Sequence, residues 1–141
     1  MGLVLSLGVT GCYGTLKDYS PKNQVEAEVR RSLLGFQQAY NARDPSMLVH
    51  YLHQEPVVVA ESEGFFTVGE RTGDEAVRFL SQAMDRFPEM HLGEPTIFIA
   101  LEPGDRVVLE VISAFGKEAV PTKFSMIKDG ERWAIKKILF Y

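Results

Sequence analysis

The stretch FQQAYNARDPSMLVHYL, residues 36–52, holds the end of one helix, a turn and the start of another helix. Asp44 suits the N-cap because its carboxylate can accept hydrogen bonds from the first free backbone N–H groups of a helix. Pro45 suits the first helical turn, where no N–H is needed. We therefore predict a short second helix after Asp44. Its buried side should consist of Met47, Leu48, Tyr51 and Leu52.

The residues before this turn have the pattern of a longer amphipathic helix, from about Pro21 to Tyr40. Its apolar positions recur on one stripe at helical spacing. They are Val25, Val29, Leu33, Phe36 and Tyr40. Gly35 lies inside this helix, where glycine costs about 1 kcal/mol relative to alanine. A close approach of another element to the helix would explain it.

The residues after the turn alternate between short apolar runs and one more helical pattern. We predict a third helix from about Gly73 to Phe87, ended by Pro88. The predicted strands are Val57–Val59, Phe65–Val68, Thr96–Leu101, Arg106–Phe115, Val120–Lys128 and Arg132–Tyr141. Helices on one side of a mostly antiparallel sheet make an α+β fold.

The last two strands read as a hairpin around Asp129-Gly130, a dipeptide typical of two-residue turns. With these two residues as the turn, Met126 faces Trp133 and Phe124 faces Ile135. Strict alternation then places Lys137 on the same face as Phe124 and Trp133.

Three stretches resemble the nuclear transport factor 2-like superfamily, which includes ketosteroid isomerase and SnoaL-like polyketide cyclases. They are FQQAYNARDPSMLVHYL (36–52), TGDEAVRFLSQAMDRFPEM (72–90) and KDGERWAIKKI (128–138). The resemblance implies a cone-shaped, cystatin-like domain over residues 24–141. A curved antiparallel sheet, with about four long strands and a short hairpin, would pack on three N-terminal helices. The resemblance also implies a homodimer formed through the sheet face.

The same resemblance implies where isomerase-type catalytic groups would lie. Phe36 stands where such enzymes have a tyrosine, Ala60 where they have a basic aspartate, and Lys123 near the second acid. None of these roles is filled, so we expect no isomerase mechanism. The alternative is a SnoaL-like enzyme for a small hydrophobic substrate, for which the candidate catalytic residues are His91, Glu61 and Lys137.

The aromatic residues suggest an apolar cavity for a small ligand. Its expected lining is Phe36, Tyr40, Tyr51, Phe124, Trp133 and Lys137. His50 and His53 are expected on the second helix, facing away from its apolar side, with no third ligand for a metal. Glu110 interrupts an apolar strand and is expected to pair with Lys123 or Lys136 on the outer sheet face.

The N-terminus carries an uncharged apolar run, residues 1–11, that ends at Cys12, the single cysteine. Val9-Thr10-Gly11-Cys12 resembles the lipobox of bacterial lipoproteins, in which the cysteine receives the lipid. This predicts a signal-peptide-like segment, a tether over 12–23 and a lipid anchor at Cys12 in the bacterial cell envelope. No Lys or Arg precedes the run, and MGLVLS also fits a myristoylation pattern. The alternatives are therefore a myristoylated or a cytoplasmic protein.

The net charge of −4 argues against a nucleic-acid partner. No glycine-rich phosphate loop, metal motif or Ser-His-Asp pattern occurs, so no cofactor or metal is predicted. We expect a lipid-anchored domain that binds a small apolar ligand or a protein partner without catalysis of its own. The other alternative is a structural interaction module with a filled cone.

Overall fold

The computed structural model describes residues 24–63, 66–87, 89–99 and 105–141, and for 59–63 and 66–68 it describes the backbone only. The segment 1–11, the tether 12–23 and Cys12 therefore lie outside the described residues. The described helices are α2 (Gln24–Asn41), α3 (Pro45–His50) and α4 (Gly73–Arg86). The strands are β1 (Leu52–Glu63), β2 (Phe66–Thr72), β3 (Met90–Leu92), β4 (Thr96–Ile99), β5 (Arg106–Phe115), β6 (Glu118–Asp129) and β7 (Arg132–Phe140). The α+β class is confirmed.

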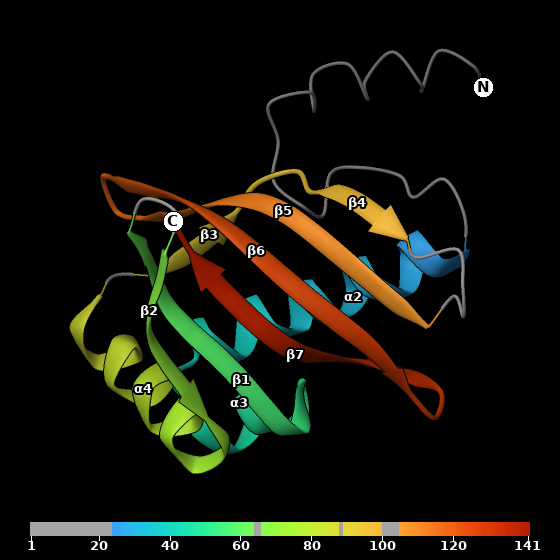
Figure 1. The fold of residues 1–141 in the computed structure, drawn as a ribbon, viewed down its shortest axis with the longest axis horizontal. Coiled ribbons are helices and arrows are strands. Elements are labelled where there is room, and N and C mark those ends of the chain that lie inside the picture. The colour runs from blue at the N-terminus through green and yellow to red at the C-terminus, as the bar shows by residue number, and fades with distance from the viewer. Residues whose placement is uncertain (1–23, 64–65, 88, 100–104) are drawn as a thin grey trace.

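The strands form one curved, unclosed seven-stranded sheet in the order β2-β1-β7-β6-β5-β3, with β4 also paired to β5. All pairings are antiparallel except β1 with β7, which is parallel. Figure 1 shows α2 crossing one face of the sheet behind β5, β6 and β7, while α4 lies beside β1 and β2. The core lies between the three described helices and the sheet.

The turn at Asp44 forms as its residues predict. The carboxylate of Asp44 accepts hydrogen bonds from the backbone N–H groups of Ser46 and Met47, and Pro45 occupies the first turn. Leu48 is fully buried, but Met47 is 45% exposed, so its assignment to the buried side is wrong. His53 lies on β1 rather than on the second helix.

The first strand is longer than predicted. The prediction ended this strand at Val59, whereas β1 runs from Leu52 to Glu63, so Glu61 lies within the strand rather than after it. β3, over 90–92, was not predicted at all. Three residues carry too little alternation to identify a strand, and β3 exists because it pairs with the end of β5.

The register of the last hairpin differs from the prediction. Asp129 pairs with Arg132, so the turn consists of Gly130 and Glu131, and Met126 faces Ile135. Gly130 takes a φ of +70°, the left-handed conformation that glycine adopts without steric cost. Trp133 therefore pairs with Lys128 rather than with Met126.

A β-bulge then turns the side chains in the second half of β7 to the opposite faces of the sheet from those predicted. Met126 pairs with Ile135 but Ser125 pairs with Lys137, which leaves Lys136 as the extra residue. Phe124 consequently pairs with Ile138, and both are fully buried. Because neighbouring residues of a strand point to opposite faces, Lys137 lies on the face opposite Phe124. The prediction that Lys137 shares the face of Phe124 and Trp133 is wrong.

The outer sheet face carries the expected ion pair. The Nζ atom of Lys123 lies 3.6 Å from a carboxylate oxygen of Glu110, its cross-strand partner. Within the described residues, no helix combines the length and apolar character needed to cross a membrane.

Candidate functional site

An apolar cavity of about 320 Å³ lies between α2, α4 and the ends of β5, β6 and β7. Its aromatic wall comprises Phe36, Tyr40, Phe79, Phe87, Phe115, Phe140 and Tyr141. The other described lining residues are Leu80, Ala83, Met90, Val120 and Glu118. This volume falls at the lower end of the roughly 300–1,000 Å³ typical of small-molecule pockets.

Ring packing around Phe115, edge-to-face with Tyr40 and tilted with Phe87, shapes one end of the cavity. The ring centroid of Phe115 lies 6.0 Å from that of Tyr40 and 5.9 Å from that of Phe87. Phe115 thus bridges α2 and the residue that follows α4. Contacts of this kind hold aromatic rings in defined orientations.

Tyr40 supplies a buried polar group to this wall. The residue is 4% exposed, and its hydroxyl is buried with no hydrogen-bond partner among the described residues. Burial raises the pKa of Tyr40 to about 12, an effect that the nearby Arg43 guanidinium opposes. The phenol is therefore neutral at physiological pH and can donate one hydrogen bond.

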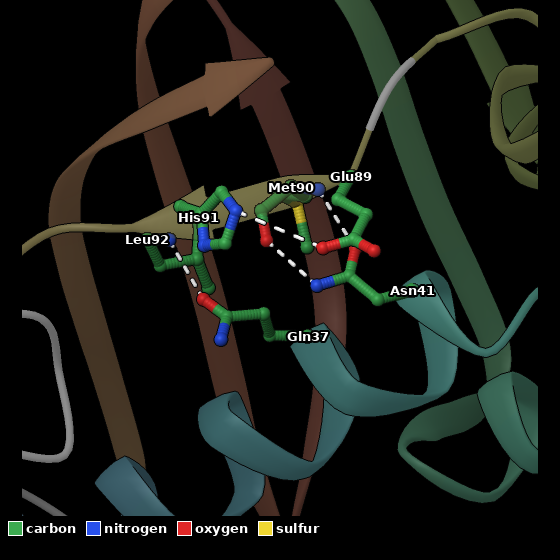
Figure 2. A network of polar contacts seen from close by, with 6 residues as sticks. All are labelled: Gln37, Asn41, Glu89, Met90, His91 and Leu92. Carbon is green, nitrogen blue, oxygen red and sulfur yellow. Dashed lines mark hydrogen bonds and ion pairs between the residues drawn. The ribbon is translucent and has the colours of Figure 1, made fainter. Parts of the chain in front are cut away.

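Two amide side chains of α2 hold the strand that contributes Met90 to the cavity. Asn41 accepts from the backbone N–H of Met90 at 2.7 Å and donates to its carbonyl oxygen at 2.9 Å, as Figure 2 shows. One turn earlier, the Gln37 side-chain oxygen accepts from the N–H of Leu92 at 2.7 Å. Both amides satisfy the free edge of β3, which would otherwise expose unpaired backbone groups.

Two of the three candidate catalytic residues, His91 and Lys137, are not among the described lining residues of this cavity. The His91 side chain is 59% exposed and its Nε2 atom lies 3.9 Å from a carboxylate oxygen of Glu89 (Figure 2). Lys137 lies on the opposite sheet face from Phe124 and does not line the cavity. Glu61 pairs with Val68 through the backbone, and its side chain lies outside the description.

The predicted lining is only partly the lining found. Phe36 and Tyr40 line the cavity, while Phe124 is fully buried and packs edge-on against Phe36 at 5.7 Å. Trp133 is also buried, and its Nε1 atom donates to the Glu28 carboxylate at 3.0 Å.

Tyr51, the last of the predicted lining residues, packs against α2 at Gly35. The lining residues that were not predicted lie on α4, on β3 and at the ends of β5, β6 and β7, above all Phe79, Phe115 and Phe140. Ala76, Leu80, Ala83 and Phe87 recur at helical spacing and predict an apolar face of α4, but this pattern does not include Phe79 and does not indicate that part of the face borders a cavity.

The histidines do not assemble a metal site in the described part of the chain. His50 is the last residue of α3 and His53 lies on β1. No three His, Cys, Asp or Glu side chains of the described residues gather in a geometry that could hold an ion.

No protein-family model and no curated protein sequence matches this chain. Solved structures do resemble it. An NTF2-like protein of unknown function from Shewanella baltica matches with a TM-score of 0.65 and 11% identity, over 87% of this chain and 97% of the other. A protein of unknown function with a cystatin-like fold from Nostoc punctiforme gives 0.65 and 11%, over 86% and 93%.

A candidate ketosteroid isomerase from Shewanella frigidimarina gives a TM-score of 0.64 and 18% identity, over 83% of this chain and 97% of the other. Identities this low establish the fold and leave ligand and reaction open. The chain therefore has the NTF2-like, cystatin-like fold.

Proposed function

We propose that this domain binds a small apolar ligand in the cavity bordered by α2, α4 and β5–β7. The observation that carries the proposal is the cavity itself, about 320 Å³ with a predominantly aromatic wall. Tyr40 adds a point of specificity, because its buried hydroxyl has no partner among the described residues. An acceptor oxygen on the ligand would satisfy that hydroxyl, which otherwise costs about 1–3 kcal/mol.

Binding accounts for this wall better than catalysis does. The polar groups of the described lining are two phenols and the exposed Glu118. A phenol with a pKa of about 12 is a poor general base at neutral pH. His91 and Lys137, which could have supplied acid–base chemistry, lie away from the cavity.

A cavity-filling variant and a matched control variant test the proposal. Phenylbutanol serves as the probe, since it joins an aromatic ring to an acceptor oxygen. We expect it to raise the melting temperature of the wild-type domain and to remain bound in native mass spectrometry. Ala83→Trp fills the cavity and should abolish both effects. Gln82→Trp, on an exposed position of the same helix, should retain them. Equal binding by both variants would place the probe elsewhere and refute the proposal.

Tyr40→Phe separates the contribution of the hydroxyl from that of the cavity. We expect phenylbutanol to bind this variant about threefold to tenfold more weakly, the effect of one hydrogen bond. Unchanged affinity would show that Tyr40 acts only as part of the apolar wall.

We also propose that the domain is carried on a lipid anchor in a bacterial envelope. The support is the sequence Val9-Thr10-Gly11-Cys12 after an apolar run. A full-length chain expressed in bacteria should incorporate labelled palmitate and accumulate as an unprocessed form under globomycin. Cys12→Ser should remove the label. A wild-type chain that takes up no label would contradict the anchor.

A further inference from the structure

One charged side chain stands out in the described lining of the cavity. Glu118 begins β6 and pairs across the hairpin with Phe115, whose ring packs against Tyr40. Glu118 is exposed, whereas Tyr40 is buried, so the carboxylate lies on the solvent side of this wall. No ion-pair partner for Glu118 occurs among the described residues.

The arginines that contact the aromatic rings of the cavity wall are not themselves part of the described lining. The guanidinium of Arg71 lies 4.2 Å from the ring centroid of Phe79 and donates to the carbonyl of Gly69. The guanidinium of Arg86 lies 5.4 Å from the ring centroid of Phe87. Neither arginine is among the lining residues.

Two further cations near the cavity have partners of their own. Lys123 pairs with Glu110 and lies 5.7 Å from the ring centroid of Tyr141, and Arg43 donates to the carbonyl of Met84. A ligand in the cavity would therefore meet aromatic faces and one carboxylate, with no cation in the described wall.

We propose that the cavity selects among apolar ligands by the charge of their head group. It takes amines, accepts uncharged alcohols and disfavours carboxylates, because a head group that reaches the Tyr40 hydroxyl also lies near Glu118, the cross-strand partner of Phe115. The Tyr40 hydroxyl can accept a hydrogen bond from an ammonium group as well as donate one to an alcohol, so the charge of Glu118 sets the order. Aromatic faces reinforce this order, since they attract cations. This inference rests on the proposed binding function and specifies its ligand class.

Three matched probes test the order of affinities. Phenylbutylamine, phenylbutanol and phenylbutyrate share an aromatic ring on a short alkyl chain and carry a positive, neutral or negative head group at pH 7. Titration calorimetry on the wild-type domain should show the amine binding about twofold to fivefold tighter than the alcohol, as expected for one exposed charge pair. The carboxylate should bind weaker than the alcohol by a similar factor.

Glu118→Gln identifies the group responsible. In this variant the three affinities should converge, because the affinity for the amine falls and the affinity for the carboxylate rises. Glu131→Gln removes the same charge from the exposed β6–β7 turn and should leave the order intact. Added salt should narrow the spread in the wild type, because it screens exposed charges.

The outcomes separate the two proposals. Equal affinities for all three probes in the wild type would overturn charge selection and leave the binding function standing. A spread that persists in Glu118→Gln would also overturn it, since another group would then set the order. If the wild type binds none of the probes, both the binding function and the selection fail.

Discussion

The ring of Tyr51 lies against the backbone of α2 at Gly35. A Cβ atom on Gly35 would come within 2.4 Å of two ring carbons of Tyr51 and 2.6 Å of its hydroxyl oxygen. Tyr51 is the residue that follows α3, so this contact sets how closely the two helices approach. It explains why a glycine occurs in the middle of a helix whose other positions favour a side chain.

The contact predicts that Gly35→Ala destabilises the fold when Tyr51 is present and stabilises it when Tyr51 is replaced by alanine. In the wild-type background the added methyl group forces the Tyr51 ring to move, and we expect a net loss of about 1 kcal/mol in the free energy of unfolding. In a Tyr51→Ala background the same change should stabilise by about 1 kcal/mol, through helix propensity. Urea denaturation of the four proteins measures both effects. Equal effects in the two backgrounds would rule out the steric explanation.

The two hydrogen bonds between the Asn41 side chain and the backbone of Met90 hold β3, and we call them the Asn41 clamp. They predict a local effect on hydrogen exchange. Asn41→Ala removes the partners of both backbone groups of Met90, at a cost of about 1–3 kcal/mol. The Met90 amide should lose protection while the His91 amide, which points toward β5, keeps it. Gln37→Ala should instead expose the Leu92 amide. Exchange measured by NMR reports each amide separately. A uniform loss of protection across β3 would contradict separate roles for the hydrogen bonds from Asn41 and Gln37.

The clamp also predicts a difference between two replacements of Asn41. Asn41→Asp keeps an acceptor for the Met90 N–H but sets a carboxylate oxygen against the Met90 carbonyl, which it repels. In hydrogen exchange the Met90 amide should therefore keep more protection than in Asn41→Ala, although both variants lose stability. Because Met90 lines the cavity, both variants should also weaken phenylbutanol binding.

The Glu28 carboxylate predicts an acid-sensitive fluorescence signal. Hydrogen bonds from Gln24 and Trp133 lower the pKa of Glu28 below 4.5, with a smaller contribution from Lys128. A lowered pKa stabilises the fold above the unfolded value, and this contribution is lost as the pH falls through the folded value. Trp133 is the single tryptophan, so its emission should change in that range below pH 4.5. Glu28→Gln should abolish this step and Glu131→Gln should not; a step that persists in Glu28→Gln has another origin.

Two buried hydroxyls on neighbouring strands predict opposite responses to removal. Ser113 is fully buried, and its hydroxyl has no hydrogen-bond partner within the described residues. Ser113→Ala should therefore stabilise the fold by about 1 kcal/mol. The hydroxyl of Thr122 is also buried but donates to the Val120 carbonyl at 2.9 Å. Thr122→Val should destabilise by a similar amount. The melting temperatures of both variants measure these changes in stability. A destabilised Ser113→Ala would mean that the Ser113 hydroxyl has a hydrogen-bond partner.

Local chemistry was enough to predict the helices and most strands. The cap at Asp44 and the stripe through Val29, Leu33 and Phe36 depend on residues close in the chain, and both formed as predicted. The lining of the cavity was harder to predict, because the register of the paired strands decides to which face of the sheet each side chain points. One extra residue, Lys136, turns Lys137 away from Phe124, and nothing in the alternation of β7 marks that position.

The neighbouring strand β1 is irregular at the same place as this bulge. β1 pairs with β7 at Leu52 and again from Val57 onward, with an irregularity between them. Pro56 lies in that interval and has no N–H for the ladder. The Nζ atom of Lys136 donates to the carbonyl of Glu55 across the gap at 2.7 Å. Such a coupling between distant segments cannot be read from either segment alone.

The parallel pairing of β1 with β7 also has a consequence for biosynthesis. Val58 lies beside Ile138, so the middle of the sheet joins two segments that leave the ribosome far apart in time. Contacts of such long sequence separation slow folding. On that side β1 and its hairpin partner β2 have no neighbouring strand until β7 is made. A nascent chain truncated before β7 should therefore expose an apolar strand edge and need a chaperone, however well its helices have formed.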